Sequence, residues 1–292
     1  MTPAPDGLPP DWLDRRAFPY RSRWWETPHG KMHYIDEGTG APVIFIHGVP
    51  GWSFHFRHLI GRVSTHRRCI AMDHLGFGLS DKPERWDYHP EQLAAHVEGL
   101  MEGLGLKGVT LVVHDWGGPL GLRYALRKPG NVTGLVIMNT WLWSAKGDLR
   151  TRSTTRILAS RLYRTLDAHF AVTARAFPRM VSGGHARLSR TARTHFAGPF
   201  LEARDRSGLL ALVRHTHTAD DWVGGLWRMR EELRDIPALI IWGMRDPAFP
   251  PRYLERWRAA LPLARCVTLD EVGHYPFEEF PEATGEAIDA FL

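Results

Sequence analysis

The sequence predicts an α/β fold in which helices flank a mostly parallel sheet. Short apolar runs alternate along the chain with segments of helical pattern, which is typical of parallel strands joined through helices. The chain has 292 residues, of which 43% are hydrophobic and 24% are charged, so it is long enough to bury one large core. No apolar run reaches the ~20 residues of a membrane span. We therefore expect one α/β domain carrying an insertion.

Each predicted element follows from a local pattern. The apolar runs that indicate strands are residues 43–46, 69–72, 110–113, 135–138, 238–242 and 266–269. Helical patterns lie between the first two strands and near residues 90–104, 117–128, 251–260 and 281–291. The regular alternation stops after residue 138 and resumes at 237, so the insertion is expected between these points.

The most informative stretch runs from Thr110 to Gly118, where an apolar strand leads into a turn with Asp115 at its apex. In the Gly-x-Ser-x-Gly form of this turn, the apex residue is a nucleophile exposed above the sheet, and the next backbone N–H faces a developing oxyanion. Here Asp115 occupies the apex, Val113 replaces the first glycine, and Gly117 keeps the second. A carboxylate nucleophile suits displacement at an sp³ carbon. An Asp after a strand is also a common helix N-cap, so the motif alone leaves that structural role open.

Two further sites complete a pattern of nucleophile, acid and histidine in that order. The strand at 238–242 is followed by Asp246, and the strand at 266–269 precedes Gly273 and His274. Three such sites in order are much rarer than one, and an imidazole with a pKa near 6.5 can act as a base at neutral pH. The sequence therefore predicts a catalytic triad of Asp115, Asp246 and His274.

The loops after the first two strands also carry signals. Residues 47–50, His-Gly-Val-Pro, form a loop whose backbone could supply a second oxyanion donor, with a simple tight turn as the alternative. The loop after the second strand contains Gly76 and Gly78. No third glycine follows at the spacing of a dinucleotide fingerprint, and no helix opens there, so we do not expect NAD binding.

Taken together, these residues resemble the haloalkane dehalogenase family of α/β-hydrolases, which includes the related β-lactone decarboxylases. The resemblance runs from about Trp24 to the C-terminus and is weak between about Ser144 and Leu226, where the family inserts a helical cap. The segments that carry it are residues 47–50, 73–83, 114–118, 242–246 and 273–274. It implies an α/β-hydrolase fold with a cap after the sixth strand: a core at 1–143 and 227–292, and a cap at 144–226.

The resemblance also implies a hydrolase that displaces a leaving group from carbon and forms an alkyl-enzyme ester. The first expectation is hydrolytic dehalogenation of haloalkanes to an alcohol and a halide. In that scheme Asp115 attacks carbon, His274 activates water, and Asp246 orients the imidazole and stabilises its charge. Family subgroups differ in whether the acid follows the strand before or after the cap. The earlier position carries Asn139, so Asp246 is the better candidate.

Backbone and indole N–H groups would stabilise the negative charges that develop. The resemblance assigns the backbone N–H groups of Val49 and Trp116 to the oxyanion hole, and it assigns one halide donor to Trp116. A departing halide needs a second donor in a dry pocket. One family group uses Asn where this chain has Val49, whose side chain cannot donate. Another group uses a cap tryptophan, so Trp141 and Trp143, which are closest to the sheet end, are candidates, with aromatic packing as the alternative for each.

Other functions stay open at this point. An epoxide hydrolase also uses an Asp nucleophile but needs acidic O–H donors, and the cap offers one tyrosine, Tyr163. A β-lactone decarboxylase has nearly the same motifs. A ligand-binding receptor on a hydrolase scaffold is the non-enzymatic alternative, because fold does not determine function. Such proteins commonly lose a triad member, whereas this chain keeps all three.

We expect no cofactor and no metal. The sixteen histidines include no His-Glu-x-x-His motif, and His215 and His217 are more plausibly polar residues of the cap than ligands. The two cysteines, Cys69 and Cys266, lie on apolar runs and are expected to be free thiols.

The charge is concentrated in the cap, where residues 150–214 hold thirteen Arg and three acids against a formal net charge of +5 for the chain. Nucleic-acid-reading motifs are absent, so we favour a solvated helical face, with substrate steering or an acidic partner as alternatives. The expected partners are a small hydrophobic substrate and a halide ion, and the oligomeric state is open. The first residues show no signal peptide, so a cytoplasmic location is expected.

Overall fold

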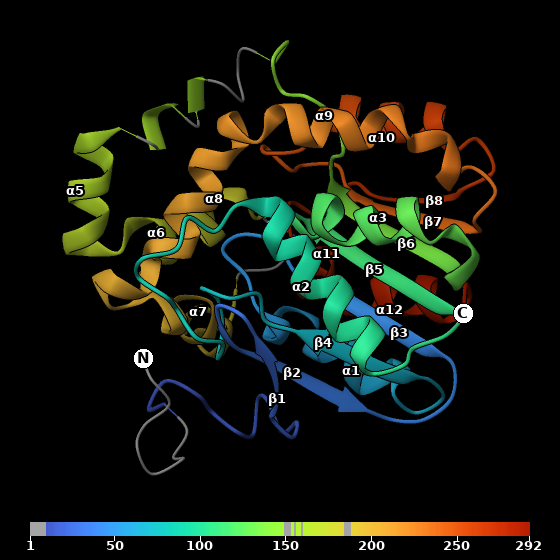
Figure 1. Ribbon diagram of the computed structural model, residues 1–292, viewed down its shortest axis with the longest axis horizontal. Coiled ribbons are helices and arrows are strands. Elements are labelled where there is room, and N and C mark those ends of the chain that lie inside the picture. Colours follow the sequence, from blue (N-terminus) through green and yellow to red (C-terminus); the bar gives the residue numbers. More distant parts are fainter. Residues whose placement is uncertain (1–9, 149–152, 155, 159, 184–187) are drawn as a thin grey trace.

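An eight-stranded sheet forms the centre of the structure, which is a computed structural model describing residues 10–292 except 149–152, 155, 159 and 184–187 (Figure 1). The strand order is β1-β2-β4-β3-β5-β6-β7-β8. The strands are β1 (Arg23–Thr27), β2 (Gly30–Glu37), β3 (Pro42–Ile46), β4 (Arg68–Met72), β5 (Val109–Asp115), β6 (Val132–Thr140), β7 (Ala238–Gly243) and β8 (Arg265–Leu269). Every neighbouring pair from β4 through β8 is parallel, so the predicted mostly parallel sheet is confirmed.

The two N-terminal strands, β1 and β2, have no counterpart among the predicted strands. They pair antiparallel with each other, and β2 pairs antiparallel with β4. β1 lies at the edge of the sheet with the sequence Arg-Trp-Trp-Glu-Thr, and most of its residues are exposed. An edge strand that is not covered on both faces needs no continuous apolar run, so the pattern that reveals the parallel strands is missing here.

Helices cover both faces of the sheet. Neighbouring strand residues point to opposite faces, so Ile44 and Ile46 join one apolar cluster while Val43 and Phe45 join the other. The helices α2 and α3 pack into the first cluster, and α1 and α12 pack into the second. The core helices are α1 (Arg57–Val63), α2 (Pro90–Gly103), α3 (Gly117–Arg127), α10 (Pro251–Ala260), α11 (Pro276–Glu279) and α12 (Pro281–Asp289). All the predicted core helices are confirmed, within a few residues at their ends.

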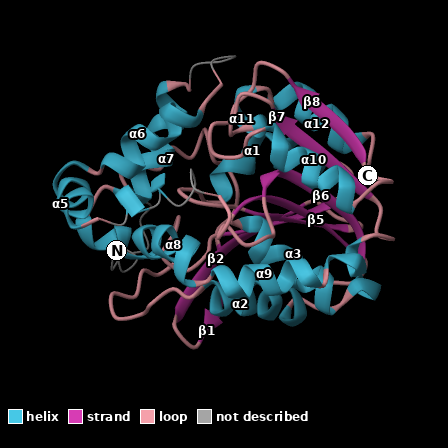
Figure 2. Cartoon of the chain, turned by 90° about the horizontal axis from the view of Figure 1, so that it is seen from above, coloured by secondary structure: helices cyan, strands magenta, loops and turns pink. Residues whose placement is uncertain are grey.

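A group of helices lies between β6 and β7 in the chain, as expected for an insertion after the sixth strand. They are α5 (Arg161–Phe170), α6 (Val172–Val181), α7 (Arg190–Ala197), α8 (Ser207–Thr218) and α9 (Asp220–Arg228). The two ribbon views place α5 to α7 together at one end of the molecule, away from the C-terminus, whereas α9 lies beside α3 of the core (Figures 1 and 2). The limits 144 and 226 of the cap stay a prediction, since α9 extends across the second of them.

Candidate functional site

Asp115 lies at a sharp turn between β5 and α3, with a backbone φ of 51°. A residue other than glycine rarely adopts this left-handed conformation, and it persists only where the surroundings impose it. Here the surroundings impose the conformation through close packing of the turn. A Cβ atom on Gly117 would lie 2.0 Å from the carbonyl oxygen of Ile46, and one on Gly118 would lie 2.0 Å from Oγ1 of Thr140. The small residues after Asp115 therefore allow the turn to press against β3 and β6.

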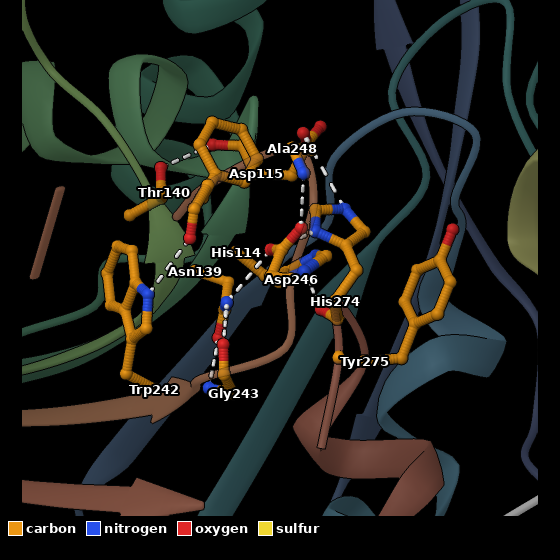
Figure 3. A network of polar contacts seen from close by, with 12 residues as sticks. His114, Asp115, Asn139, Thr140, Trp242, Gly243, Asp246, Ala248, His274 and Tyr275 are labelled. Atoms are coloured by element: carbon orange, nitrogen blue, oxygen red, sulfur yellow. Dashed lines mark hydrogen bonds and ion pairs between the residues drawn. The ribbon is translucent and has the colours of Figure 1, made fainter. Parts of the chain in front are cut away.

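The three predicted triad residues come together at the carboxyl ends of the strands (Figure 3). Nδ1 of His274 lies 2.8 Å from Oδ2 of Asp246, and Nε2 of His274 lies 3.8 Å from Oδ2 of Asp115. The imidazole thus stands between the two carboxylates. Oδ1 of Asp246 accepts a hydrogen bond of 2.7 Å from the backbone N–H of Ala248, which orients the carboxylate toward the imidazole.

Burial sets the acid–base properties of this group. Burial raises the pKa of Asp115 to about 6, although His274 and the backbone N–H groups of Val49 and Trp116 act in the opposite direction. Burial also disfavours a charge on His274, but the Asp246 carboxylate, its hydrogen bond and Asp115 outweigh this effect and raise the pKa of His274 above its usual 6.5. A carboxylate that ionises near neutrality beside a stabilised imidazolium is typical of a functional site.

The carboxylate of Asp115 is held by backbone donors and does not cap the helix. The N-cap of α3 is Trp116, and no side chain caps that helix end. The backbone N–H of Val49 donates to Oδ1 of Asp115 at 2.7 Å, and the backbone N–H of Trp116 also hydrogen-bonds this carboxylate. A Cβ atom on Gly48 would lie 2.2 Å from Oδ1 of Asp115, so only glycine permits this approach. The two donors predicted for an oxyanion hole both face Asp115.

Two residues that support the triad were not predicted to do so. Asn139, considered above only as an alternative place for the acid, donates from Nδ2 to Oδ2 of Asp246 at 2.8 Å and accepts from the backbone N–H of Gly243 at 2.9 Å. Nε2 of His114 lies 2.8 Å from the carbonyl oxygen of His274, to which it can only donate. The position of Asn139 at the end of β6 was a usable signal, whereas His114 belongs to the motif at residues 114–118 but nothing local indicated its contact with the carbonyl of His274.

The loop that carries His274 is bound directly to the insertion. The backbone N–H of His274 donates to the carbonyl of Val181 at 2.9 Å. The buried carboxylate of Glu279 accepts from the backbone N–H of Gly183 at 2.7 Å and from that of Gly273 at 3.1 Å. Glu279 therefore joins the end of α6 to the loop that carries His274.

An apolar cavity of ≈160 Å³ opens beside Asp115. Its wall combines core residues with residues of the insertion. The described residues that line it are Val49, Asp115, Trp116, Trp141, Ala145, Thr154, Leu158, Phe177, Val213, Thr216, Pro247, Ala248, Phe249, Arg252 and Tyr253. Most of these side chains are apolar, and Asp115 is the carboxylate among them, so the cavity suits a small hydrophobic ligand that reacts at Asp115.

The two tryptophans proposed as halide donors, Trp141 and Trp143, lie in different places relative to the cavity. Trp141 is part of the cavity wall, and its ring stacks on Phe249 at a centroid distance of 5.4 Å. Trp143 does not line the cavity. It packs edge-on against Trp227 at 5.1 Å and lies 5.7 Å from Trp257, in an aromatic cluster behind the wall. The two residues are two positions apart in the sequence but have different surroundings.

The other polar groups singled out in the sequence have structural partners. Nδ1 of His215 lies 2.7 Å from Oγ1 of Thr218, and Nε2 lies 2.9 Å from the carbonyl of Asp87. Cys69 and Cys266 are free thiols, as expected. Within the described residues no group of three potential ligands could hold a metal ion, and no helix there is long and apolar enough to cross a membrane.

Comparison with known proteins identifies relatives across nearly the whole chain. Residues 41–281 match the model of the alpha/beta hydrolase fold family. The chain is 33% identical over 279 residues to haloalkane dehalogenase 2 of Mycobacterium tuberculosis, covering 94% of this chain and 96% of the relative. It is 34% identical over 278 residues to a cis-3-alkyl-4-alkyloxetan-2-one decarboxylase of Xanthomonas campestris, covering 89% of this chain and 92% of the relative.

Solved structures agree on the fold. The haloalkane dehalogenase DatA of Agrobacterium tumefaciens superimposes with a TM-score of 0.82 over 92% of this chain and 95% of that chain, at 22% identity. The fold, the two types of relative and the elbow with its aspartate all agree with the resemblance that the sequence motifs indicate. The chain is an enzyme of the α/β-hydrolase superfamily and belongs to the haloalkane dehalogenase family, which includes the related β-lactone decarboxylases.

Proposed function

We propose that this enzyme hydrolyses small haloalkanes to an alcohol and a halide ion, with Asp115 as the nucleophile. The observation that carries the proposal is the position of the Asp115 carboxylate, which accepts a hydrogen bond on Oδ1 from the backbone N–H of Val49 while Asp115 lines an apolar cavity. The relatives named haloalkane dehalogenase support the same reaction. An apolar cavity of ≈160 Å³ limits the substrate to a short chain or to the reactive end of a longer one.

The first step is displacement at carbon. Oδ2 of Asp115 attacks the carbon that bears the halogen, the carbon–halogen bond breaks, and the halide leaves with the bonding electron pair. The product is an alkyl ester of Asp115. Oδ2 suits this attack because the Val49 N–H occupies Oδ1. Ionised Asp115 is required, so the step needs a pH above the pKa of about 6.

The second step is hydrolysis of the ester. Nε2 of His274 takes a proton from water, and the hydroxide attacks the Asp115 carbonyl carbon. The oxyanion forms at Oδ1, where the N–H group of Val49 stabilises it, and the N–H group of Trp116 also hydrogen-bonds this carboxyl group. When the oxyanion collapses, the bond between Cγ of Asp115 and the alkoxy oxygen breaks, and the alcohol leaves with the proton that His274 took from water. Esterification removes the negative charge of Asp115, which helps to raise the pKa of His274 in the free enzyme. The imidazole is therefore more readily neutral, and a better proton acceptor, after the first step than before it.

The departing halide needs donors, and we assign them to the indole N–H groups of Trp116 and Trp141. Both residues line the cavity, and their rings meet edge-on at a centroid distance of 4.8 Å. The indoles of Trp52, Trp242 and Trp257 donate to backbone carbonyls. No acceptor among the described residues engages those of Trp116 and Trp141. Trp141 thus replaces the side-chain donor that Val49 lacks.

Epoxide hydrolysis fits the cavity less well, because it needs a free phenol to protonate the opening oxygen. Tyr163, the tyrosine considered in the sequence, pairs with Oγ1 of Thr173 at 2.9 Å and does not line the cavity. Tyr253 does line it, but its hydroxyl donates to Oδ2 of Asp148 at 2.9 Å.

Decarboxylation of β-lactones is the second candidate, and the 34% identity to the oxetanone decarboxylase of Xanthomonas campestris favours it. The same groups would serve this reaction. Asp115 would attack the sp³ ring carbon bonded to the ring oxygen, that carbon–oxygen bond would break, and the N–H groups assigned to halide would face the carboxylate formed. Loss of CO2 from this carboxylate would form the alkene double bond and break the bond to Asp115, which leaves as its free carboxylate. Halide release from 1-bromoalkanes and alkene release from β-lactones distinguish the two activities in one substrate panel.

The covalent step is tested with a His274→Phe variant. Displacement by Asp115 stays possible, whereas ester hydrolysis stops, so incubation with a reactive 1-bromoalkane should add the alkyl mass to the protein with about one halide released per active site. Peptide mapping should locate the adduct on Asp115. The double variant Asp115→Asn, His274→Phe is the matched control and should show neither adduct nor halide. If wild type turns over and His274→Phe gains no adduct, water attacks the substrate directly and Asp115 is not a nucleophile.

A further inference from the structure

The insertion carries an exposed apolar row on its outermost helix. Leu162, Leu166 and Phe170 follow one another on α5 at intervals of four residues, which places them on one face, and they are 72%, 43% and 63% exposed. Ile157 before α5 and Met180 on α6 are also exposed, at 64% and 73%. Large apolar side chains gathered on the surface mark an interaction site.

Arginines surround this row. Arg156, Arg161, Arg175 and Arg179 are all exposed, and no ion pair engages them within the described residues. From residue 149 to 201 the sequence contains one acid, Asp167, which is buried and paired with Arg206 at 3.0 Å. We call the set of five exposed apolar residues and these four arginines the cap patch. The cap patch therefore combines exposed apolar side chains with arginines that no neighbouring acid in the described part of the chain neutralises.

We propose that the cap patch binds the surface of an anionic phospholipid bilayer. An amphipathic helix with Leu and Phe on one face and arginine beside them lies in the plane of a membrane, with its apolar side chains at the boundary between headgroups and acyl chains. Both ribbon views place α5 at the outer end of the molecule, and the side chains of the patch are exposed (Figures 1 and 2).

A second copy of this chain fits the patch less well. A two-fold contact sets the same patch against itself, which would place the arginines of one copy close to those of the other without acids to neutralise them. The anionic headgroups of a bilayer supply the missing negative charge along the whole row.

The patch adjoins the cavity, which gives the interaction a role that rests on the proposed function. Leu158 follows the exposed Ile157 and lines the cavity, and Phe177 lines it from α6 between the exposed Arg175 and Arg179. A bilayer at the patch would lie close to the cavity entrance. Because apolar haloalkanes and lactones concentrate in the hydrocarbon of a membrane, the enzyme would draw its substrate from there.

The test is co-sedimentation of the full chain with vesicles of equimolar phosphatidylcholine and phosphatidylglycerol, compared with phosphatidylcholine alone. Binding should require phosphatidylglycerol and weaken as salt is raised. The double variant Arg161→Gln, Arg175→Gln should lower the partition coefficient about 30-fold, because each arginine near an anionic surface contributes about a fivefold factor. Leu162→Gln with Phe170→Gln should lower it about tenfold or more.

Matched controls lie on the core. The double variant Arg23→Gln, Arg265→Gln removes exposed arginines, and Met229→Gln with Leu263→Gln removes exposed apolar side chains, so neither should change vesicle binding. All four variants should hydrolyse a soluble substrate as wild type does, since none of these residues lines the cavity.

Absence of binding to the mixed vesicles, or an equal loss in the controls, overturns the proposal. A dimer that dissociates in the patch variants, without vesicle binding, would assign the patch to a second copy. Loss of hydrolysis with vesicle binding intact would count against the proposed reaction and leave the membrane contact standing.

Discussion

Asp115 has a strained backbone and a carboxylate whose charge is destabilised by burial. Both features lower the stability of the folded protein, and both arise from the position of Asp115 at the apex of the elbow. Its φ of 51° is one that asparagine and glycine adopt more readily than aspartate. Burial raises the pKa of its carboxyl from 3.8 to about 6, so the folded state disfavours the ionised form. The folded protein therefore carries a penalty that is fully present above pH 6 and absent below pH 3.8.

An Asp115→Asn variant should consequently be more stable than wild type at neutral pH. A pKa difference of about two units corresponds to about 3 kcal/mol of unfolding free energy at pH 8, and the gain should shrink toward zero near pH 4. Urea denaturation at the two pH values measures it. Asp270→Asn, at an exposed position, should change stability little at either pH. A gain of equal size at both pH values would mean that the buried charge is not its cause.

Trp141 and Trp143 offer a second comparison of single residues. Trp141→Phe keeps the aromatic packing but removes the indole N–H that we propose as a halide donor, so kcat for haloalkane hydrolysis should fall about 100-fold, the effect of losing one donor to a developing anion. Trp143→Phe removes an N–H behind the cavity wall and should change kcat by less than about threefold. Similar kcat values for the two variants would exclude Trp141 as the donor. Halide release under saturating 1-bromoalkane is the measurement.

The elbow works as a unit of β5, the turn and α3, and its glycines differ in purpose from glycines elsewhere. Gly117 lies where β3 passes within contact of the turn, whereas Gly99 of α2 has open space around its Cβ position. The same substitution therefore has opposite consequences at the two sites.

Gly117→Ala should lower the free energy of unfolding by about 2 kcal/mol or more, because its methyl group meets the backbone of Ile46, which cannot move without disturbing the sheet. Gly99→Ala should raise it by about 0.5–1 kcal/mol through helix propensity. Chemical denaturation with both variants decides between these signs. A neutral Gly117→Ala would show that the turn relaxes more easily than its packing indicates.

The molecule as a whole consists of a sheet core and an insertion that meet at the active site. Within the insertion, the buried ion pair of Asp167 and Arg206 joins α5 to the segment before α8. Oδ1 of Asp167 also accepts a hydrogen bond of 2.7 Å from the backbone N–H of Thr173. This pair ties together the helices that carry the cap patch and line the cavity.

Removing one partner of that pair should loosen the insertion while the core stays folded. Asp167→Ala removes the carboxylate that faces the buried guanidinium of Arg206, and loss of one partner of a buried ion pair costs about 3–5 kcal/mol in comparable sites. We expect faster hydrogen exchange in α5 and α6 than in wild type and unchanged exchange in β5 and β6. The double variant Asp167→Leu, Arg206→Met removes both charges and should restore slow exchange. Equal acceleration in the strands would show that the insertion and the core unfold together.

Local patterns in the chain were sufficient for the parallel strands, the core helices, and the order of Asp115, Asp246 and His274. Apolar runs, helical periodicity and turn residues act over a few neighbouring positions, so they can be recognised without knowing the fold. The proximity of these three side chains could be predicted for the same reason, since carboxyl ends of parallel strands meet at one edge of the sheet.

Long-range packing decided the rest. Asn139 supports the acid because β6 lies beside β7, and Glu279 holds the histidine loop because the end of α6 returns to it. Trp141 faces the cavity and Trp143 faces an aromatic cluster although they are two residues apart and of one type. No local pattern separates such pairs, because the surroundings of each side chain are supplied by segments a hundred residues away in the chain.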